Sequence, residues 1–208
     1  NHVQRAAIAS SKRVSNPGCY PTGFLGLVAP LVQAGIIPAD MRLTLNAVSG
    51  YSGGGKELIA RFEQDQDIGF RSYGFAMGHK HVPEMQRYAA LAFEPLFAPA
   101  VVPVFRGMLV EVPLNFAHPV ADAALETLTA HYAESKLVGV SRSEAAELLL
   151  RKDDPASDRM ELQVFASQDG RQLRLVARLD NLGKGASGAC VQNLNIMAGL
   201  DELAGLRA

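Results

Sequence analysis

One cysteine stands in a setting that would make it a nucleophile. The segment NPGCYPT at 16–22 places a proline and a glycine directly before Cys19, and an apolar helical pattern begins at Pro21. The predicted turn presents the thiol just before a helix N-terminus, where free backbone N–H groups and the helix dipole favour the thiolate. The same N–H groups are placed to stabilise an oxyanion on a carbonyl under attack. The alternative is that Cys19 is a small buried packing residue, as most free cysteines are.

A cluster of ionisable residues near the middle of the chain offers a partner for proton transfer. The segment GHKHVPE at 78–84 contains His79, His81 and Glu84, and its proline predicts the start of a helix. Imidazole is the side chain best suited to exchange a proton with a nucleophile near neutral pH. A zinc site built from Cys19 and both histidines is an alternative, but no fourth ligand is evident.

Two glycine-rich motifs are typical of phosphate binding, and each departs from a nucleotide-binding pattern. Residues 50–56 read G-x-x-x-x-G-K, but Glu57 stands where a P-loop requires Ser or Thr for magnesium, which argues against an NTPase. Gly183, Gly185 and Gly188 spell G-x-G-x-x-G, but the chain ends before the second strand of a Rossmann unit can follow. The second motif therefore predicts a basic, glycine-rich helix start that approaches phosphates donated from another domain.

The hydrophobic patterns predict the elements that position these residues. Helices are predicted at 21–34, from 57, at 83–93, 121–136, 143–151 and 187–203, and strands at 43–49, 101–105, 108–115, 161–166 and 172–179. Asp169-Gly170 predicts a hairpin between the last two strands. Strands that meet as hairpins, with helices between them, predict an α+β fold with a largely antiparallel sheet and helices on one side.

The composition argues against several classes of function. The chain has 208 residues, 48% of them hydrophobic, and a net charge of -1. It has no basic stripe for nucleic acid and no run of roughly 18 apolar residues for a membrane helix. With only two cysteines, Cys19 and Cys190, a disulfide scaffold is disfavoured and a reducing cytoplasm is expected. The start at Asn1, without Met and in helical sequence, predicts that a longer protein has lost its front part.

Four segments, taken in order, resemble the signature blocks of the N-acetyl-γ-glutamyl-phosphate reductase family: 16–22, 49–56, 79–84 and 180–188. The chain is similar to the shorter of the family's two types, in which His-Lys-His precedes Pro-Glu. The resemblance implies, over residues 1–182, a catalytic and dimerisation domain of the aspartate-semialdehyde dehydrogenase and glyceraldehyde-3-phosphate dehydrogenase superfamily. Residues 183–208 would form a C-terminal helix that packs on an absent N-terminal NADP-binding domain.

The resemblance also implies a reaction. The family reduces N-acetyl-γ-glutamyl phosphate to N-acetylglutamate semialdehyde with NADPH in arginine biosynthesis, through a thioester on the cysteine that matches Cys19. His81 would handle the proton, since the family's histidine directly precedes x-Pro-Glu. Glu84 would orient this histidine or bind substrate.

Other residues are expected to bind the ligands. Arg106 and Lys56 are candidates for the substrate's carboxylate or phosphate, unless they are surface charges. The cofactor contacts that the resemblance implies are Asn181, Lys184, Gly185 and Ala186. The expected partners are a small acyl phosphate and further copies of the chain in a dimer or tetramer, and neither nucleic acid nor membrane.

Three alternatives stay open. A paralogue acting on a carrier-bound aminoadipyl phosphate or on aspartyl phosphate would share the thioester chemistry. The chain would otherwise be a dimerisation module without activity of its own. A cysteine hydrolase also fits a Cys and His pair, but it leaves the glycine block at Lys184 without a role.

Overall fold

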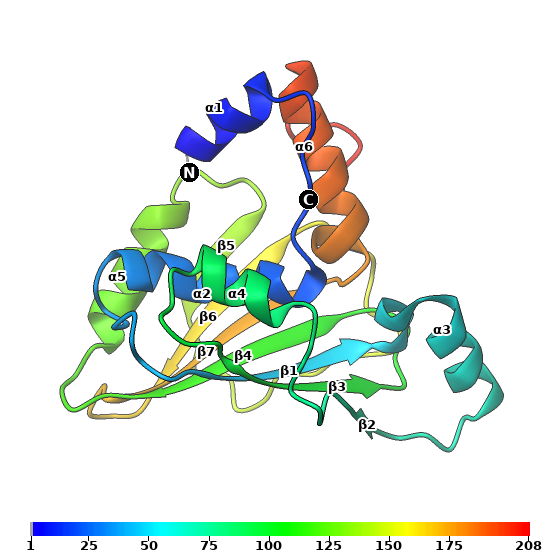
Figure 1. Ribbon diagram of the computed structural model, residues 1–208, viewed down its shortest axis with the longest axis horizontal. Helices are drawn as coiled ribbons and strands as arrows, with labels where there is room; N and C mark the ends of the chain where they lie inside the picture. Colours follow the sequence, from blue (N-terminus) through cyan, green and yellow to red (C-terminus); the bar gives the residue numbers. More distant parts are fainter. Residues whose placement is uncertain (1) are drawn as a thin grey trace.

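A mixed seven-stranded sheet forms the centre of the computed structural model, which describes residues 2–208 (Figure 1). The strands are β1 (Thr44–Gly50), β2 (Arg71–Ser72), β3 (Leu96–Val102), β4 (Met108–Asn115), β5 (Val138–Arg142), β6 (Met160–Ala166) and β7 (Gln172–Leu179). Their order across the sheet is β2-β3-β1-β4-β7-β6-β5. The β1–β3 and β5–β6 pairs are parallel and the others are antiparallel. The predicted α+β fold with a largely antiparallel sheet is confirmed.

The helices cover one face of this sheet and extend beyond it. They are α1 (His2–Ser10), α2 (Cys19–Gln33), α3 (Gly55–Gln64), α4 (Val82–Tyr88), α5 (Ala121–Tyr132) and α6 (Gly188–Ala198), with a 3₁₀ turn η1 (Tyr51–Gly54) and a π-helical turn η2 (Gly183–Ser187). Figure 1 shows α2, α4 and α5 above the sheet, α3 at its end, and α1 beside α6 farther out. This arrangement leaves the opposite face of the sheet without a helical cover.

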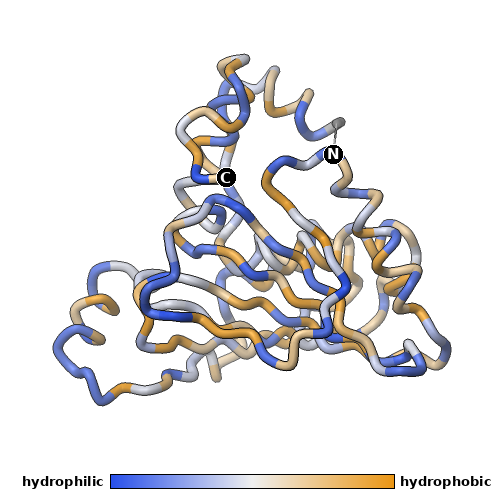
Figure 2. Tube along the Cα trace, turned by 180° about the vertical axis from the view of Figure 1, so that it is seen from behind, coloured by the Kyte–Doolittle hydropathy of each residue, from blue (hydrophilic) through white to orange (hydrophobic). Residues whose placement is uncertain are grey.

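Alternation of apolar and polar residues along the strands produces the core between the sheet and α2 (Figure 2). In β4, Met108, Val110 and Val112 are fully buried, whereas Leu109 and Glu111 are partly exposed. From the other side, α2 contributes Phe24, Leu27 and Leu31, none of which is exposed. Each such side chain contributes on the order of 2 kcal/mol through burial.

One feature of α2 lets it lie close to the sheet, and another joins it to α5. A Cβ at Gly23 would be 2.9 Å from the Val110 side chain, so only glycine permits this approach. Pro30, inside the helix, cannot donate a hydrogen bond to the carbonyl of Gly26. Tyr132 of α5 donates its hydroxyl to that carbonyl at 2.9 Å, which satisfies the acceptor and ties the two helices together.

The structure corrects several predicted elements. The predicted helix at 143–151 is wrong, because this segment is irregular: Ser143 donates its backbone N–H to Val164 at 3.1 Å, and Leu150 packs on Gly107. These tertiary contacts override a helical composition. The last helix ends at Ala198 because Gly199 adopts a left-handed conformation, whereas the pattern extended it to 203. The strand predicted at 101–105 lies at Leu96–Val102, and the short strands β2 and β5 were not predicted.

Candidate active site

Cys19 is the first residue of α2, two residues before the helix start that the sequence predicted, and its thiol is free and half-buried. Gly18 precedes it in an extended conformation, and its carbonyl accepts the backbone N–H of Thr22 at 2.9 Å. Burial raises the pKa of the Cys19 thiol, and hydrogen bonds from the backbone N–H groups of Tyr20 and Cys19 oppose this shift. The thiol is therefore protonated at neutral pH and requires a base.

His81 lies directly against Gly18, the residue before Cys19. A Cβ added to Gly18 would lie 2.7 Å from Cδ2 and 2.8 Å from Cε1 of His81, and closer still to Nε2. Burial, together with His79 and Lys80, lowers the pKa of His81 to about 4. Its Nδ1 is buried and has no hydrogen-bond partner. His81 is therefore a neutral imidazole near pH 7, with the protonation state of a base.

Aromatic rings and the second histidine, His79, pack around His81. The rings of His79 and His81 are 4.9 Å apart, and the backbone N–H of His81 donates to His79 Nδ1 at 3.2 Å. Tyr20 packs at 6.0 Å from His81, and Tyr73 donates its hydroxyl to the Tyr20 hydroxyl at 3.2 Å. His79 thus packs against His81 and receives a backbone hydrogen bond from it.

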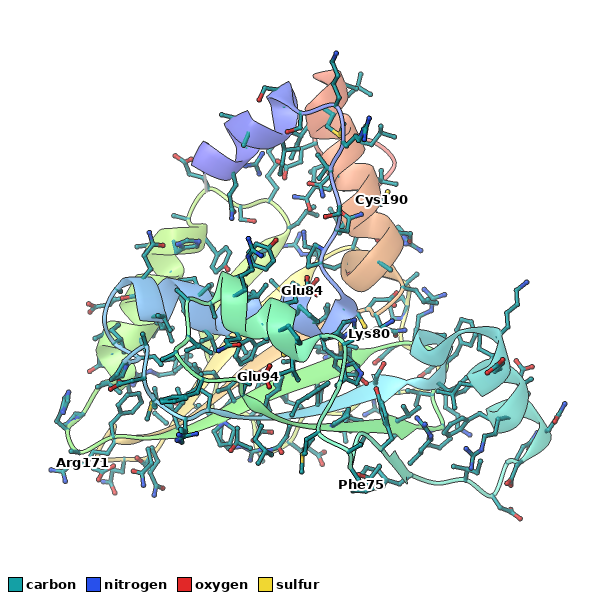
Figure 3. The ribbon with its side chains drawn as sticks, viewed as in Figure 1. Phe75, Lys80, Glu84, Glu94, Arg171 and Cys190 are labelled. Atoms are coloured by element: carbon teal, nitrogen blue, oxygen red, sulfur yellow. The ribbon has the colours of Figure 1, made fainter. Side chains whose placement is uncertain are left out.

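Glu84 contacts the turn that precedes Cys19. The backbone N–H of Gly18 donates to Glu84 Oε1 at 3.3 Å and Oε2 at 3.4 Å, which joins the start of α4 to the start of α2. Figure 3 shows Glu84 on α4 and Lys80 on the loop before it, both facing the region where α2 begins. Lys80 lowers the pKa of Cys19 while Glu84 raises it. The carboxylate is placed to hold the turn.

A cavity of about 380 Å³ opens beside Cys19. Its walls come from the start of α2, from the glycine-rich turn after β1, from α3, and from β2 with the residues next to it. The residues that line it are Cys19, Tyr20, Ser49, Gly50, Gly53, Gly54, Glu57, Leu58, Arg61, Arg71, Tyr73 and Val101. A small molecule in this cavity reaches the thiol and two guanidinium groups together.

The two basic residues predicted to bind substrate do not line this cavity. Arg106 donates from Nη1 to Asp180 Oδ2 at 3.0 Å, and the Asp180 side chain is only 5% exposed. Lys56 is exposed at the start of α3. Sequence reasoning instead missed Arg61 and Arg71, because neither belongs to a motif and β2 is only two residues long.

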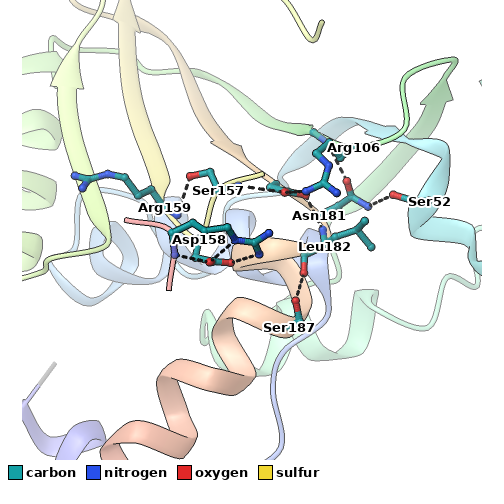
Figure 4. Close-up of polar contacts among 11 residues, drawn as sticks. Ser52, Arg106, Ser157, Asp158, Arg159, Asn181, Leu182 and Ser187 are labelled. Carbon is teal, nitrogen blue, oxygen red and sulfur yellow. Dashed lines mark hydrogen bonds and ion pairs between the residues drawn. The ribbon is translucent and has the colours of Figure 1, made fainter. Parts of the chain in front are cut away.

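Three of the residues predicted to bind cofactor contact other residues of this chain. Asn181, 3% exposed, donates from Nδ2 to Ser52 Oγ at 2.9 Å and accepts the Gly107 N–H at 3.0 Å (Figure 4). Lys184, 9% exposed, donates to Gln192 of α6, and burial lowers the pKa of its amine. Gly185 is buried, and a Cβ there would lie 3.0 Å from Cys19 Cβ.

Ala186 is different, since it is exposed. It directly follows Gly185, the glycine that lies close to Cys19. The side chains of Asn181 and Lys184 hold the segment in place.

Other candidate sites offer less. Among residues 2–208, no group of three or more His, Cys, Asp or Glu side chains is arranged to hold a metal ion, the Cys19, His79 and His81 set included. A larger and more open hollow lies at the β6–β7 turn near Arg171, which Figure 3 marks, and it contains no cysteine or histidine. In the described part of the chain, every helix is too short or too polar to cross a membrane.

A family model and two curated relatives match this chain over most of its length. Residues 19–181 match the family model described as semialdehyde dehydrogenase, dimerisation domain. The chain is 45% identical to an N-acetyl-gamma-glutamyl-phosphate reductase of Trichormus variabilis over 99% of this chain and 70% of the relative. It is 47% identical to the protein of the same name from Rhizobium meliloti, over 94% of this chain and 67% of the relative.

Solved structures share the fold at lower identity. The aspartate semialdehyde dehydrogenase II of Vibrio cholerae matches with a TM-score of 0.68 and 20% identity, over 94% of this chain and 66% of that protein. A probable aspartate-semialdehyde dehydrogenase from Pseudomonas aeruginosa matches with a TM-score of 0.67 and 21% identity, over 93% and 66%. The chain thus spans about two thirds of the length of these relatives.

Proposed function

Because this chain belongs to the N-acetyl-gamma-glutamyl-phosphate reductase family of semialdehyde dehydrogenases, we propose that it carries the catalytic half of such a reductase. The observation that carries the proposal is Cys19 at the start of α2, with the neutral imidazole of His81 packed against the preceding glycine. The substrate is N-acetyl-γ-glutamyl phosphate, and the product is N-acetylglutamate 5-semialdehyde, in arginine biosynthesis.

The first step is acyl transfer to sulfur. His81 takes the proton of the Cys19 thiol, and Sγ attacks the acyl carbon of the substrate. A C–S bond forms, the bond between the acyl carbon and the phosphate oxygen breaks, and phosphate leaves with the electron pair. The free N–H groups at the start of α2 stabilise the negative charge that develops on the acyl oxygen. The proton held by His81 then passes to the departing phosphate.

Reduction of the thioester requires a cofactor. NADPH, when bound, supplies the hydride that converts the acyl group to an aldehyde. We propose that Ala186 and Gly185 hold the reactive end of the cofactor beside Cys19. Asn181 and Lys184 keep this segment in position, and a domain outside this chain, on which residues 183–208 pack, binds the rest of the dinucleotide.

The assembly and the location are part of the proposal. The matched family model is a dimerisation domain, which supports a homo-oligomer of two or four copies. The sheet face without helices fits such a contact, because Leu96 on β3 is 52% exposed there. Two free cysteines and no disulfide between them agree with a reducing cytoplasm.

Acylation without cofactor tests the proposed function on this chain. Intact-mass spectrometry after addition of N-acetyl-γ-glutamyl phosphate should show one acyl group on Cys19, with one phosphate released per chain. Cys19→Ser should lower the acylation rate more than about 100-fold, because a hydroxyl is a far weaker nucleophile at neutral pH.

The same assay separates the alternatives. Faster acylation by aspartyl or aminoadipyl phosphate would identify a paralogue. Continuous phosphate release with no accumulated adduct would identify a hydrolase. A folded chain that none of these acyl phosphates acylates would be a dimerisation module, and the proposed function would be wrong.

A further inference from the structure

We propose that Arg61 and Arg71 bind the free carboxylate of the substrate, and so select acyl phosphates that carry a second negative charge away from the reacting carbonyl. This inference rests on the proposed function, because it assigns residues to that substrate. Both arginines line the cavity that contains Cys19, but they come from α3 and from β2, whereas the nucleophile comes from α2. Figure 1 shows α3 and β2 at the end of the sheet, away from the helices over its face.

Arg71 is held in place by an aromatic ring. Its guanidinium lies 4.4 Å from the centroid of the Tyr73 ring, a cation–π distance. Tyr73 in turn donates its hydroxyl to Tyr20, the residue after the nucleophile. On the backbone, Arg71 pairs with Val101 of β3, which also lines the cavity. The charge of Arg71 is therefore fixed relative to Cys19 through both its side chain and its strand.

The cavity lining carries a net positive charge. Within residues 2–208, neither Arg61 nor Arg71 forms an ion pair or a side-chain hydrogen bond. Arg106, Arg174, Arg178 and Arg207 each have a carboxylate partner. Glu57 is the acidic residue in the lining, so the two arginines leave one net positive charge for an anion. A planar guanidinium is suited to a bidentate carboxylate.

The substrate carries two anionic groups, and their positions decide which one the arginines bind. The phosphate is attached to the acyl carbon that Cys19 attacks, so it lies at the start of α2, where backbone N–H groups are available. The carboxylate lies at the other end of the carbon chain. The arginines come from α3 and β2 rather than from α2, and we assign them to the carboxylate.

A matched pair of substrates tests this assignment on the same chain. N-acetyl-γ-glutamyl phosphate and 4-acetamidobutanoyl phosphate share the acyl phosphate and the acetamido group, and only the first carries the carboxylate. Single-turnover phosphate release and the mass of the Cys19 adduct are measured for the wild type, Arg71→Met, Arg61→Met and the double variant. Arg87→Met is the control, because Arg87 is exposed on α4 and does not line the cavity.

With N-acetyl-γ-glutamyl phosphate, the second-order rate should fall roughly 10- to 100-fold in Arg71→Met and further in the double variant. With 4-acetamidobutanoyl phosphate, all variants should match the wild type, which also shows that they are folded. Equal losses with both substrates would mean that the arginines act on the phosphate, and no loss with either would mean that they do not bind substrate. Either result overturns the inference while wild-type acylation still supports the proposed function. A wild-type chain that is not acylated at all would overturn both.

Discussion

Replacing Gly18 by alanine should disable His81 without disturbing the backbone. Gly18 has φ -64 and ψ 161, a conformation that any residue adopts, so alanine introduces no backbone strain. Its Cβ would lie 2.7 and 2.8 Å from two carbons of the His81 ring, whereas ordinary contact begins at 3.4 Å. The imidazole must therefore move by about 1 Å, and a displacement of that size costs on the order of 100-fold in rate. Single-turnover acylation of Cys19 measures this loss.

A double-mutant cycle separates displacement of His81 from any other effect of the methyl group. In a His81→Ala background the ring is absent, so Gly18→Ala should cause little further loss. The free energy of unfolding of Gly18→Ala should also stay close to that of the wild type, because His81 is only partly buried and its ring can shift. If Gly18→Ala slowed acylation equally in both backgrounds, the steric reasoning and the role given to His81 would both be wrong.

Three further predictions follow from the same site. His81→Asn should slow acylation roughly 10²- to 10⁴-fold and cost more than His79→Asn, and a larger loss at His79 would reverse the assignment. Because burial lowers the pKa of His81 from 6.5 to about 4, the unfolded chain binds the additional proton between these values. The free energy of unfolding should therefore fall as pH falls from 6.5 to about 4, and urea unfolding of His81→Asn across this range should show a shallower fall. This chain alone should bind NADPH more weakly than about 10 μM, and saturable fluorescence titration below that value would contradict a cofactor site shared with another domain.

The sequence predicted the position of Cys19 at a helix start because that position depends on local rules. Proline and glycine before Cys19 force a turn, and the apolar spacing after Pro21 requires a helix, so the thiol had to lie at a helix start. The strand β4 was equally predictable, because burial alternates strictly over Met108–Asn115 and leaves only one face to bury. In β7, over Gln172–Leu179, the alternation is interrupted where Leu175, Val176 and Ala177 are all buried. These features need no information from distant parts of the chain.

The walls of the cavity were not predictable in this way. Arg61 is separated from Cys19 by β1 and η1, and Arg71 by β1, η1 and α3. Arg71 reaches the cavity because β2 pairs with β3, which pairs with β1. Arg106, a candidate from the sequence for the substrate's carboxylate or phosphate, has Asp180 as an internal partner at 3.0 Å. Whether an arginine is free or paired depends on long-range packing, which local patterns do not contain.

The glycines of the motif at 183–188 match the spacing of a phosphate-binding motif, but within this chain they are required by close packing. A glycine is required wherever something approaches the backbone too closely for a Cβ, whether a phosphate or another part of the chain. Here a Cβ at Gly183 would collide with the Ser157 carbonyl, and one at Gly188 would collide with the Asp158 carboxylate. Asp158 is only 1% exposed and binds Arg207 through both carboxylate oxygens at 3.0 Å. The spacing that resembles a dinucleotide fingerprint is therefore satisfied by packing between η2 and the segment before β6, which positions Gly185 against Cys19.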